Sequence, residues 1–169
     1  FLIFFTFFIM LKSHNIKLFV NGKKFSACIE SRLLLSDFLR YELKLTGTHV
    51  GCDTSQCGSC IVSLDGKCVK SCNVLAIQCD NKKVITVEGL GKKNELHKIQ
   101  KSFKENHGLQ CGFCTPGILF TAIELENNIE SPTEKQIRKF LDGNLCRCTG
   151  YQNIVKSIQH YMESKRNNV

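Results

Sequence analysis

The spacing of the cysteines is the feature that most constrains this chain. Cys52, Cys57 and Cys60 follow the pattern C-x4-C-x2-C, and Cys72 comes shortly after them. The four-residue gap lets a loop curl over an inorganic core with its N–H groups aimed at sulfur, and the two-residue gap is expected to place two thiolates on one iron. Gly51 suits such a loop, because without a Cβ its backbone can approach the core closely. The four cysteines therefore predict a [2Fe-2S] cluster in the first half of the chain.

A second group of cysteines organises the other half. Cys111 and Cys114 form a C-x2-C pair, and Cys146 and Cys148 form a C-x-C pair. Each pair precedes a segment predicted to be helical, and helix N-termini carry unpaired N–H groups and partial positive charge that stabilise thiolates. Zinc ribbons normally close with a second C-x2-C or a His pair, so zinc is an alternative that the spacing disfavours. A second iron–sulfur cluster is the prediction.

The total number of cysteines favours metal over disulfides. There are eleven in 169 residues, and this odd number falls largely into tight pairs with no convincing secretory signal. A chain of this length can hold one medium domain or two small ones, and bound metal compensates for the thin core of a small domain. A reducing compartment, the cytoplasm, is therefore expected.

The net charge of +8 suggests at first a nucleic-acid-binding protein. Two oxidised clusters with their thiolates would lower it to roughly +4, since each carries about two negative charges. The lysines are also scattered over predicted turns, and no basic stripe interleaved with aromatic residues is present. We expect no nucleic-acid partner.

The first residues are almost wholly apolar. Phe1–Leu11 are too few to span a bilayer, and Lys12 and His14 follow where a signal peptide has small residues. We expect the native chain to begin at Met10, residues 1–14 to lie outside the fold, and any membrane contact to be no more than peripheral.

Short strands with one helix are predicted for the next part of the chain. Ile16, Leu18 and Val20 alternate with polar residues, and Asn21-Gly22 is a strong two-residue hairpin signal. Hairpin, helix, cluster loop and further strands describe an α+β domain with a mixed sheet, at residues 15–90. The predicted elements are strands at 16–20 and 25–28, a helix at 36–45 that ends before Gly47, and strands at 61–64 and 84–87.

Beyond a linker at residues 88–93, every periodic segment is helical. Thr115 is predicted as an N-cap with Pro116 at the first helical position, and Thr133 with Gln136 predicts a capping box for a later helix. A helix before residue 108 and another starting near Tyr151 complete the set. Four short helices predict a small bundle at residues 91–169.

The chain from about Lys17 to Tyr161 resembles the iron–sulfur small subunit of the molybdenum hydroxylases, the family of xanthine dehydrogenase, aldehyde oxidoreductase and aerobic carbon monoxide dehydrogenase. Residues 46–56 are most similar to the carbon monoxide dehydrogenase type. The matching strings are GCDTSQCGSC from Gly51, VKSC ending at Cys72, QCGFCTPG from Gln110 and GNLCRCTGY from Gly143.

The resemblance implies an N-terminal β-grasp domain similar to plant-type ferredoxins, followed by an all-α four-helix [2Fe-2S]-binding domain. It implies a non-catalytic subunit that relays single electrons from a molybdopterin site, expected as the cytosine dinucleotide, in a large subunit to FAD in a medium subunit. Gln110 and Cys148 match positions that approach the molybdopterin. The ligands nearer the flavin would be Cys52, Cys57, Cys60 and Cys72, and those nearer molybdenum Cys111, Cys114, Cys146 and Cys148.

Other interpretations remain open. The complex could be a xanthine, aldehyde or N-heterocycle oxidoreductase, and the chain could instead be a free-standing ferredoxin or a zinc-binding interaction module. The sequence contains no serine–histidine or paired-carboxylate constellation. We therefore expect no bond-making catalysis within the chain.

Several further residues have simpler expected roles. Cys28, Cys68 and Cys79 match no ligand position and are expected to be semi-buried thiols, although Cys68 could compete with Cys72 as the fourth ligand. His49 is expected to pack or hydrogen-bond rather than bind metal. Arg147 is either a subunit contact or a solvated side chain.

Overall fold

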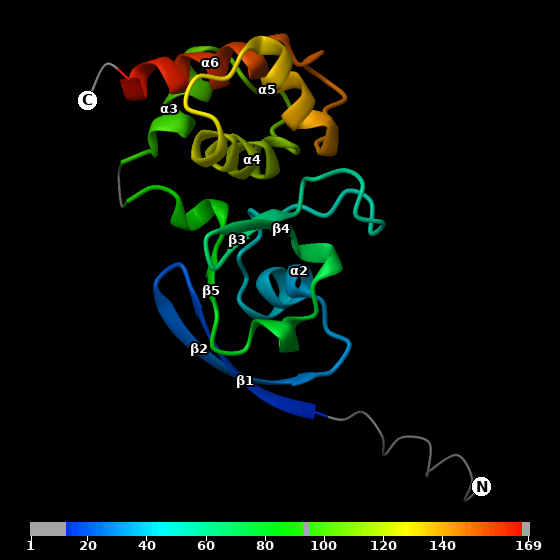
Figure 1. The fold of residues 1–169 in the computed structure, drawn as a ribbon. Helices are drawn as coiled ribbons and strands as arrows, with labels where there is room; N and C mark the ends of the chain where they lie inside the picture. Colours follow the sequence, from blue (N-terminus) through cyan, green and yellow to red (C-terminus); the bar gives the residue numbers. More distant parts are fainter. Residues whose placement is uncertain (1–12, 93–94, 167–169) are drawn as a thin grey trace, which may run out of the picture.

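The computed structural model of the protein describes residues 13–92 and 95–166. A sheet-based half and an all-helical half lie one above the other (Figure 1), which confirms the predicted α+β fold class. Within the described residues, none of the helices combines the length and apolar character needed to span a bilayer. The division into domains at residues 15–90 and 91–169 remains a prediction.

The sheet begins with the predicted hairpin. Strand β1 (Ser13–Val20) pairs antiparallel with β2 (Lys23–Glu30). Asn21 and Gly22 connect them with φ of 51° and 77°, the left-handed backbone that a tight two-residue turn requires. Most of the predicted N-terminal extension lies outside the described residues, but residues 13 and 14 belong to β1. The strand therefore starts two residues before the predicted domain.

The sheet has five strands in the order β2-β1-β5-β3-β4. Strands β3 (Ile61–Leu64) and β4 (Lys67–Lys70) form a second hairpin, and β5 (Lys83–Ile85) pairs parallel with β1 and antiparallel with β3. The sheet is thus mixed, as predicted. The final strand is shorter than residues 84–87, because the chain turns into a 3-10 helix, η5 (Val87–Gly89).

The helix predicted at residues 36–45 is shorter in the structure. One turn of α-helix, α2 (Leu35–Asp37), runs directly into a π-helical turn, η2 (Phe38–Glu42). It ends before the predicted position because Lys44 adopts the left-handed conformation, with φ of 59°. Phe38 and Leu39 are fully buried in the core of the sheet half. Short 3-10 helices also occur at η3 (Ser71–Asn73), η4 (Ala76–Cys79) and η6 (Leu141–Gly143).

Four α-helices lie within the described part of the second half, as predicted. The capping box of Thr133 and Gln136 is confirmed. The N-cap of α4 is Cys114 rather than the predicted Thr115, so the helix begins one residue earlier and includes Thr115. The helices are α3 (Lys98–Glu105), α4 (Thr115–Asn128), α5 (Glu134–Phe140) and α6 (Gln152–Arg166).

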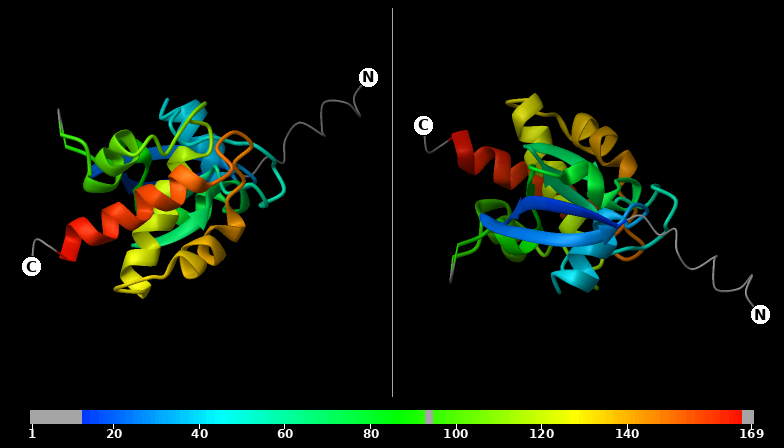
Figure 2. Two further views of the ribbon diagram at one scale, coloured as in Figure 1. Left: turned by 90° about the horizontal axis from the view of Figure 1, so that it is seen from above. Right: turned by 90° about the horizontal axis from the view of Figure 1, so that it is seen from below.

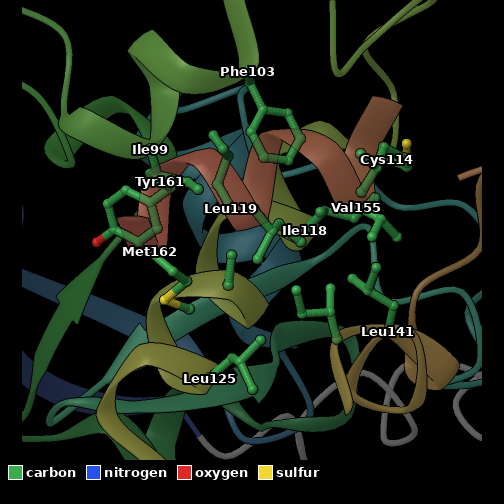
Figure 3. Close-up of a cluster of buried hydrophobic side chains, with 14 residues drawn as sticks. Ile99, Phe103, Cys114, Ile118, Leu119, Leu125, Leu141, Val155, Tyr161 and Met162 are labelled. Atoms are coloured by element: carbon green, nitrogen blue, oxygen red, sulfur yellow. The ribbon is translucent and has the colours of Figure 1, made fainter. Parts of the chain in front are cut away.

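Each half has its own hydrophobic core. The helical core includes Phe103, Ile118 and Tyr161, and Cys114 lies at its edge (Figure 3). Helix α4 lies against β3 and β4, so it joins the two halves. The β1–β2 hairpin is on the side of the molecule away from helices α3–α6, nearest the viewer in the right panel of Figure 2.

Candidate iron–sulfur sites

The loop at residues 51–60 surrounds the first site, which we define as Cys52, Cys57, Cys60 and Cys72. The N–H group of Cys57 donates to the sulfur of Cys52 at 3.4 Å. Backbone N–H groups of Cys57, Thr54 and Gln56 together lower the pKa of the Cys52 thiol to about 6. The loop therefore stabilises a thiolate with main-chain donors, as the spacing predicted.

Left-handed residues produce the tight curl of this loop. Asp53 and Ser55 have φ of 55° and 58°, and Gly58 has φ of 73°. Positive φ is unfavourable for residues with a Cβ, so the surrounding contacts must hold the two non-glycine positions in place. One such contact is the ammonium group of Lys70, which donates to the carbonyl oxygen of Ser55 at 2.6 Å.

Cys72 completes the first site from η3, just after β4. The backbone N–H and the hydroxyl of Ser71 donate to the Cys60 carbonyl oxygen at 3.2 and 2.7 Å, which fixes the two cysteine segments side by side. The hydroxyl of Ser55 is 3.8 Å from the Cys72 sulfur. Burial raises the pKa of the Cys60 thiol to about 11, and its hydrogen bond with the Cys72 thiol adds to this.

The three remaining cysteines lie elsewhere. The Cys68 thiol donates to the Phe120 carbonyl oxygen of α4 at 3.2 Å, and burial, with a hydrogen bond to Glu124, raises its pKa strongly. Cys68 is therefore directed at α4, and Cys72 is the cysteine beside the loop. Cys28 is exposed on β2, whereas Cys79 is fully buried and its pKa is raised to about 11 by burial.

The second site consists of Cys111, Cys114, Cys146 and Cys148. The sulfur atoms of Cys111 and Cys148 are 3.5 Å apart. Burial raises the pKa of Cys114 to about 12, and its thiol also shares a hydrogen bond with Cys146.

The surroundings of Cys146 favour its thiolate. Burial disfavours the charge, but the hydroxyl and backbone of Thr149 outweigh it and lower the pKa of the Cys146 thiol. The Thr149 hydroxyl is 3.1 Å from the Cys146 sulfur. The Cys146 N–H donates to the Tyr151 hydroxyl at 2.9 Å, and that hydroxyl donates to the Asn144 carbonyl oxygen at 2.9 Å.

In both sites the thiols form pairs. A metal–sulfur bond of about 2.3 Å places two thiolates of one tetrahedral metal ion about 3.8 Å apart. The 3.5 Å between the sulfur atoms of Cys111 and Cys148 is close to this separation. Four thiols that interact as two pairs suit two metal ions per site, as a [2Fe-2S] core requires. Among the described residues, no three His, Cys, Asp or Glu side chains are grouped to hold a single metal ion. The pairs are Cys52 with Cys57, Cys60 with Cys72, Cys111 with Cys148 and Cys114 with Cys146.

This pairing differs from the expectation that the two-residue gap places both of its thiolates on one iron. The Cys60 thiol interacts chiefly with the Cys72 thiol, because the Ser71 contacts bring η3 beside Cys60. The C-x2-C pair of the second site is likewise divided, since Cys114 lies at the N-terminus of α4 while Cys111 precedes it in the loop.

The two sites are in direct contact. The N–H of Leu145, the residue before Cys146, donates to the carbonyl oxygen of Cys57 at 2.9 Å. His49 stacks on Phe113 with ring centroids 4.7 Å apart, and its Nδ1 is 2.8 Å from the Phe113 carbonyl oxygen. His49 therefore packs and hydrogen-bonds, as predicted, and connects the loops of the two sites.

Known proteins share this arrangement. Residues 18–85 match the family described as "2Fe-2S iron-sulfur cluster binding domain", and residues 86–159 match "[2Fe-2S] binding domain". Caffeine dehydrogenase subunit gamma from Pseudomonas sp. (strain CBB1) is 49% identical over 152 residues, which cover 88% of this chain and 91% of the relative. A probable xanthine dehydrogenase subunit from Bacillus subtilis (strain 168) is 41% identical over 147 residues, 87% of this chain and 84% of the relative. The chain is an iron–sulfur small subunit of the molybdenum hydroxylase family.

Solved structures agree with this assignment. The small subunit superimposes on quinoline 2-oxidoreductase from Pseudomonas putida 86 with a TM-score of 0.87 and 40% identity, covering 92% of this chain and 97% of that one. It also matches aldehyde oxidoreductase from Desulfovibrio gigas, with a TM-score of 0.85 and 35% identity, over 92% of this chain but 18% of that longer chain. None of these four relatives is a carbon monoxide dehydrogenase, so that subtype remains a prediction.

One structural residue of the small subunit was missed by the sequence reasoning. Asn144 is buried, and its side chain accepts a hydrogen bond from the Thr121 hydroxyl at 2.9 Å and lies 3.5 Å from the Gly58 carbonyl oxygen. It therefore links α4, the first-site loop and the segment that leads to Cys146. Only its position two residues before Cys146 could have indicated this role.

Large hydrophobic side chains are exposed in the two segments that carry the second-site cysteines. Leu109, Phe113 and Leu145 are 41%, 45% and 58% exposed, which is unusual for large hydrophobic side chains. Gln110, Arg147 and the second-site cysteines Cys111 and Cys148 are exposed in the same segments. We call the surface of Leu109, Phe113 and Leu145 the apolar face.

Proposed function

We propose that the small subunit relays single electrons through two [2Fe-2S] clusters, one in each site. The observation that carries this proposal is the 2.9 Å hydrogen bond from the Leu145 N–H to the Cys57 carbonyl oxygen. It connects one ligand residue to the neighbour of another, so bonded atoms link the two sites. The ligands are Cys52, Cys57, Cys60 and Cys72 for the first cluster and Cys111, Cys114, Cys146 and Cys148 for the second.

The chain's own residues set the charge environment of the clusters. Bound [2Fe-2S] clusters supply reversible one-electron redox chemistry. Main-chain N–H groups at Cys52 stabilise negative charge on the first site. The N-terminus of α4, with Cys114 as its N-cap, does the same for the second. The protein thus holds the clusters close together and adjusts their potentials.

Two partner subunits follow from the proposal. A large subunit would carry molybdopterin, expected as the cytosine dinucleotide, and a medium subunit would carry FAD. The apolar face supports contact between the second site and the large subunit, since exposed hydrophobic side chains mark protein interfaces. Gln110 through its amide and Cys148 through its sulfur would approach the molybdopterin. The first site would then pass electrons to the flavin.

Several relatives are named for nitrogen heterocycles and others for aldehydes. Caffeine dehydrogenase, nicotine 6-hydroxylase and quinoline 2-oxidoreductase are all named for nitrogen heterocycles. We therefore favour the N-heterocycle alternative over carbon monoxide for the complete complex. The complex is proposed to be a hetero-oligomer in the cytoplasm, the compartment expected from the free cysteines.

Metal analysis of the purified complex tests the proposal. We expect about four iron and four acid-labile sulfide ions per small subunit, with two distinct paramagnetic signals after reduction. Zinc without sulfide would instead support the interaction module. Iron and sulfide for a single cluster, or a colourless protein, would refute the two-cluster relay. A small subunit that purifies as a monomer with both clusters would support the free-standing ferredoxin.

A further inference from the structure

A lysine ammonium group lies against the first site and has no role in binding the cluster. Lys70, at the end of β4, donates to the Ser55 carbonyl oxygen at 2.6 Å and is partly buried. Ser55 is one of the two left-handed, non-glycine residues of the first-site loop. The lysine therefore contacts the loop at a point where its backbone is constrained.

Several contacts place this ammonium group close to the metal ligands. The Ser55 hydroxyl is 3.8 Å from the Cys72 sulfur, and Lys70 itself is two residues before Cys72. In the β3–β4 pair, Lys70 is opposite Ile61, the residue after Cys60. The positive charge is thus held on Ser55, the loop residue whose hydroxyl faces the Cys72 sulfur.

The charge of Lys70 is not neutralised by a carboxylate. Within the described part of the chain, its ammonium group forms no ion pair, and the Ser55 carbonyl oxygen is its hydrogen-bond partner. An oxidised [2Fe-2S] core with four thiolates carries about two negative charges, and one added electron makes it more negative. A fixed positive charge nearby therefore stabilises the reduced state more than the oxidised state.

We propose that Lys70 is a positioning residue that raises the reduction potential of the first cluster and so favours electron flow toward it from the second. This inference rests on the proposed function. One electron leaves the second cluster and enters the first, no proton is transferred, and the flavin of the medium subunit accepts the electron from the first cluster. The ammonium group also braces the first-site loop through Ser55.

Three variants of Lys70 separate charge from packing. Lys70→Met removes the charge and keeps most of the chain length, Lys70→Gln removes the charge but keeps an amide donor for Ser55, and Lys70→Arg keeps the charge. Lys67→Met is the matched control, because Lys67 is an exposed lysine on the same strand. Each intact complex is titrated with a reductant while the two paramagnetic signals are followed separately.

We expect the Lys70→Met and Lys70→Gln variants to lower the midpoint potential of the first cluster and to leave that of the second unchanged. The Lys70→Arg variant and the Lys67→Met control should keep both potentials close to those of the wild type. If the Met variant fails to assemble the first cluster, the Gln variant supplies the same comparison. Unchanged potentials in both uncharged variants, or equal shifts in both clusters, would overturn the inference.

This outcome is separate from that of the proposed function. If the reduced wild-type complex lacks two distinct paramagnetic signals, the two-cluster relay itself is contradicted. If the wild-type complex shows both signals but the uncharged Lys70 variants keep the wild-type potential, only the role of Lys70 is contradicted.

Discussion

Gly117, near the start of α4, lies where the two halves of the protein touch through their backbones. A Cβ on this residue would lie 2.9 Å from the Gly58 carbonyl carbon, 3.1 Å from the Ser59 Cα and closer still to the Gly58 oxygen. All of these atoms belong to the backbone of the first-site loop, so no side chain can rotate away. Gly117→Ala therefore requires the helix and the loop to separate by about 1 Å, a backbone shift of the kind that overpacking a core causes.

The size of the effect follows from two opposing terms. Overpacking of this kind costs about 1–3 kcal/mol. The higher helix propensity of alanine offsets up to about 1 kcal/mol of it. We expect a net loss of about 1–2 kcal/mol, which corresponds to a fall in Tm of roughly 2–8 °C for a chain of this size. The displaced loop carries Cys57 and Cys60, so the first cluster should also be incorporated less completely.

Thermal unfolding with iron analysis of the same samples measures both effects. Gly143→Ala is the matched control, because its added Cβ would meet only the flexible end of Lys70, at 3.8 Å. The control should unfold near the wild-type temperature with full iron content. A Gly117→Ala protein with wild-type Tm and iron content would show that the two backbones are not in contact as described.

Three further predictions concern single side chains. Cys114→Ser should abolish one of the two paramagnetic signals of the reduced protein and leave the other near normal, whereas loss of both would show that the sites are not independent. Cys68→Ser should keep both signals, because that thiol faces α4; loss of the first-site signal would make Cys68 a ligand. Partial burial disfavours the charge of Glu126, but hydrogen bonds from Lys165 and Tyr161 outweigh it and lower its pKa. The stability from this carboxylate is then present above its unfolded pKa and is lost as the pH falls through the lowered value. Unfolding free energies of wild type and Glu126→Gln should therefore differ at pH 7 and converge in acid, and a constant difference would contradict the pKa shift.

Elements with strong local signals could be predicted from the sequence. The hairpin at Asn21 and Gly22 follows from turn chemistry, and the start of α5 follows from the capping box of Thr133 and Gln136, whose partners are three residues apart. The two cysteine groups also indicated two separate sites, because tight spacing leaves few ways to arrange thiolates. These features depend on neighbours in the chain, which a sequence displays directly.

Features that depend on distant contacts could not be predicted. The pairing of Cys60 with Cys72 depends on Ser71, which hydrogen-bonds back to the Cys60 carbonyl oxygen. The early end of the first helix reflects a left-handed Lys44, a residue type with no preference for that conformation. The buried role of Asn144 appears only when α4 and the first-site loop are brought together.

The hydrogen bond between Leu145 and Cys57 involves main-chain atoms alone. Any amino acid except proline supplies the same N–H donor at position 145, and every amino acid supplies the same acceptor at position 57. The surface side chains around it can thus be replaced to fit a different large subunit, while the main-chain hydrogen bond that connects the two sites is kept.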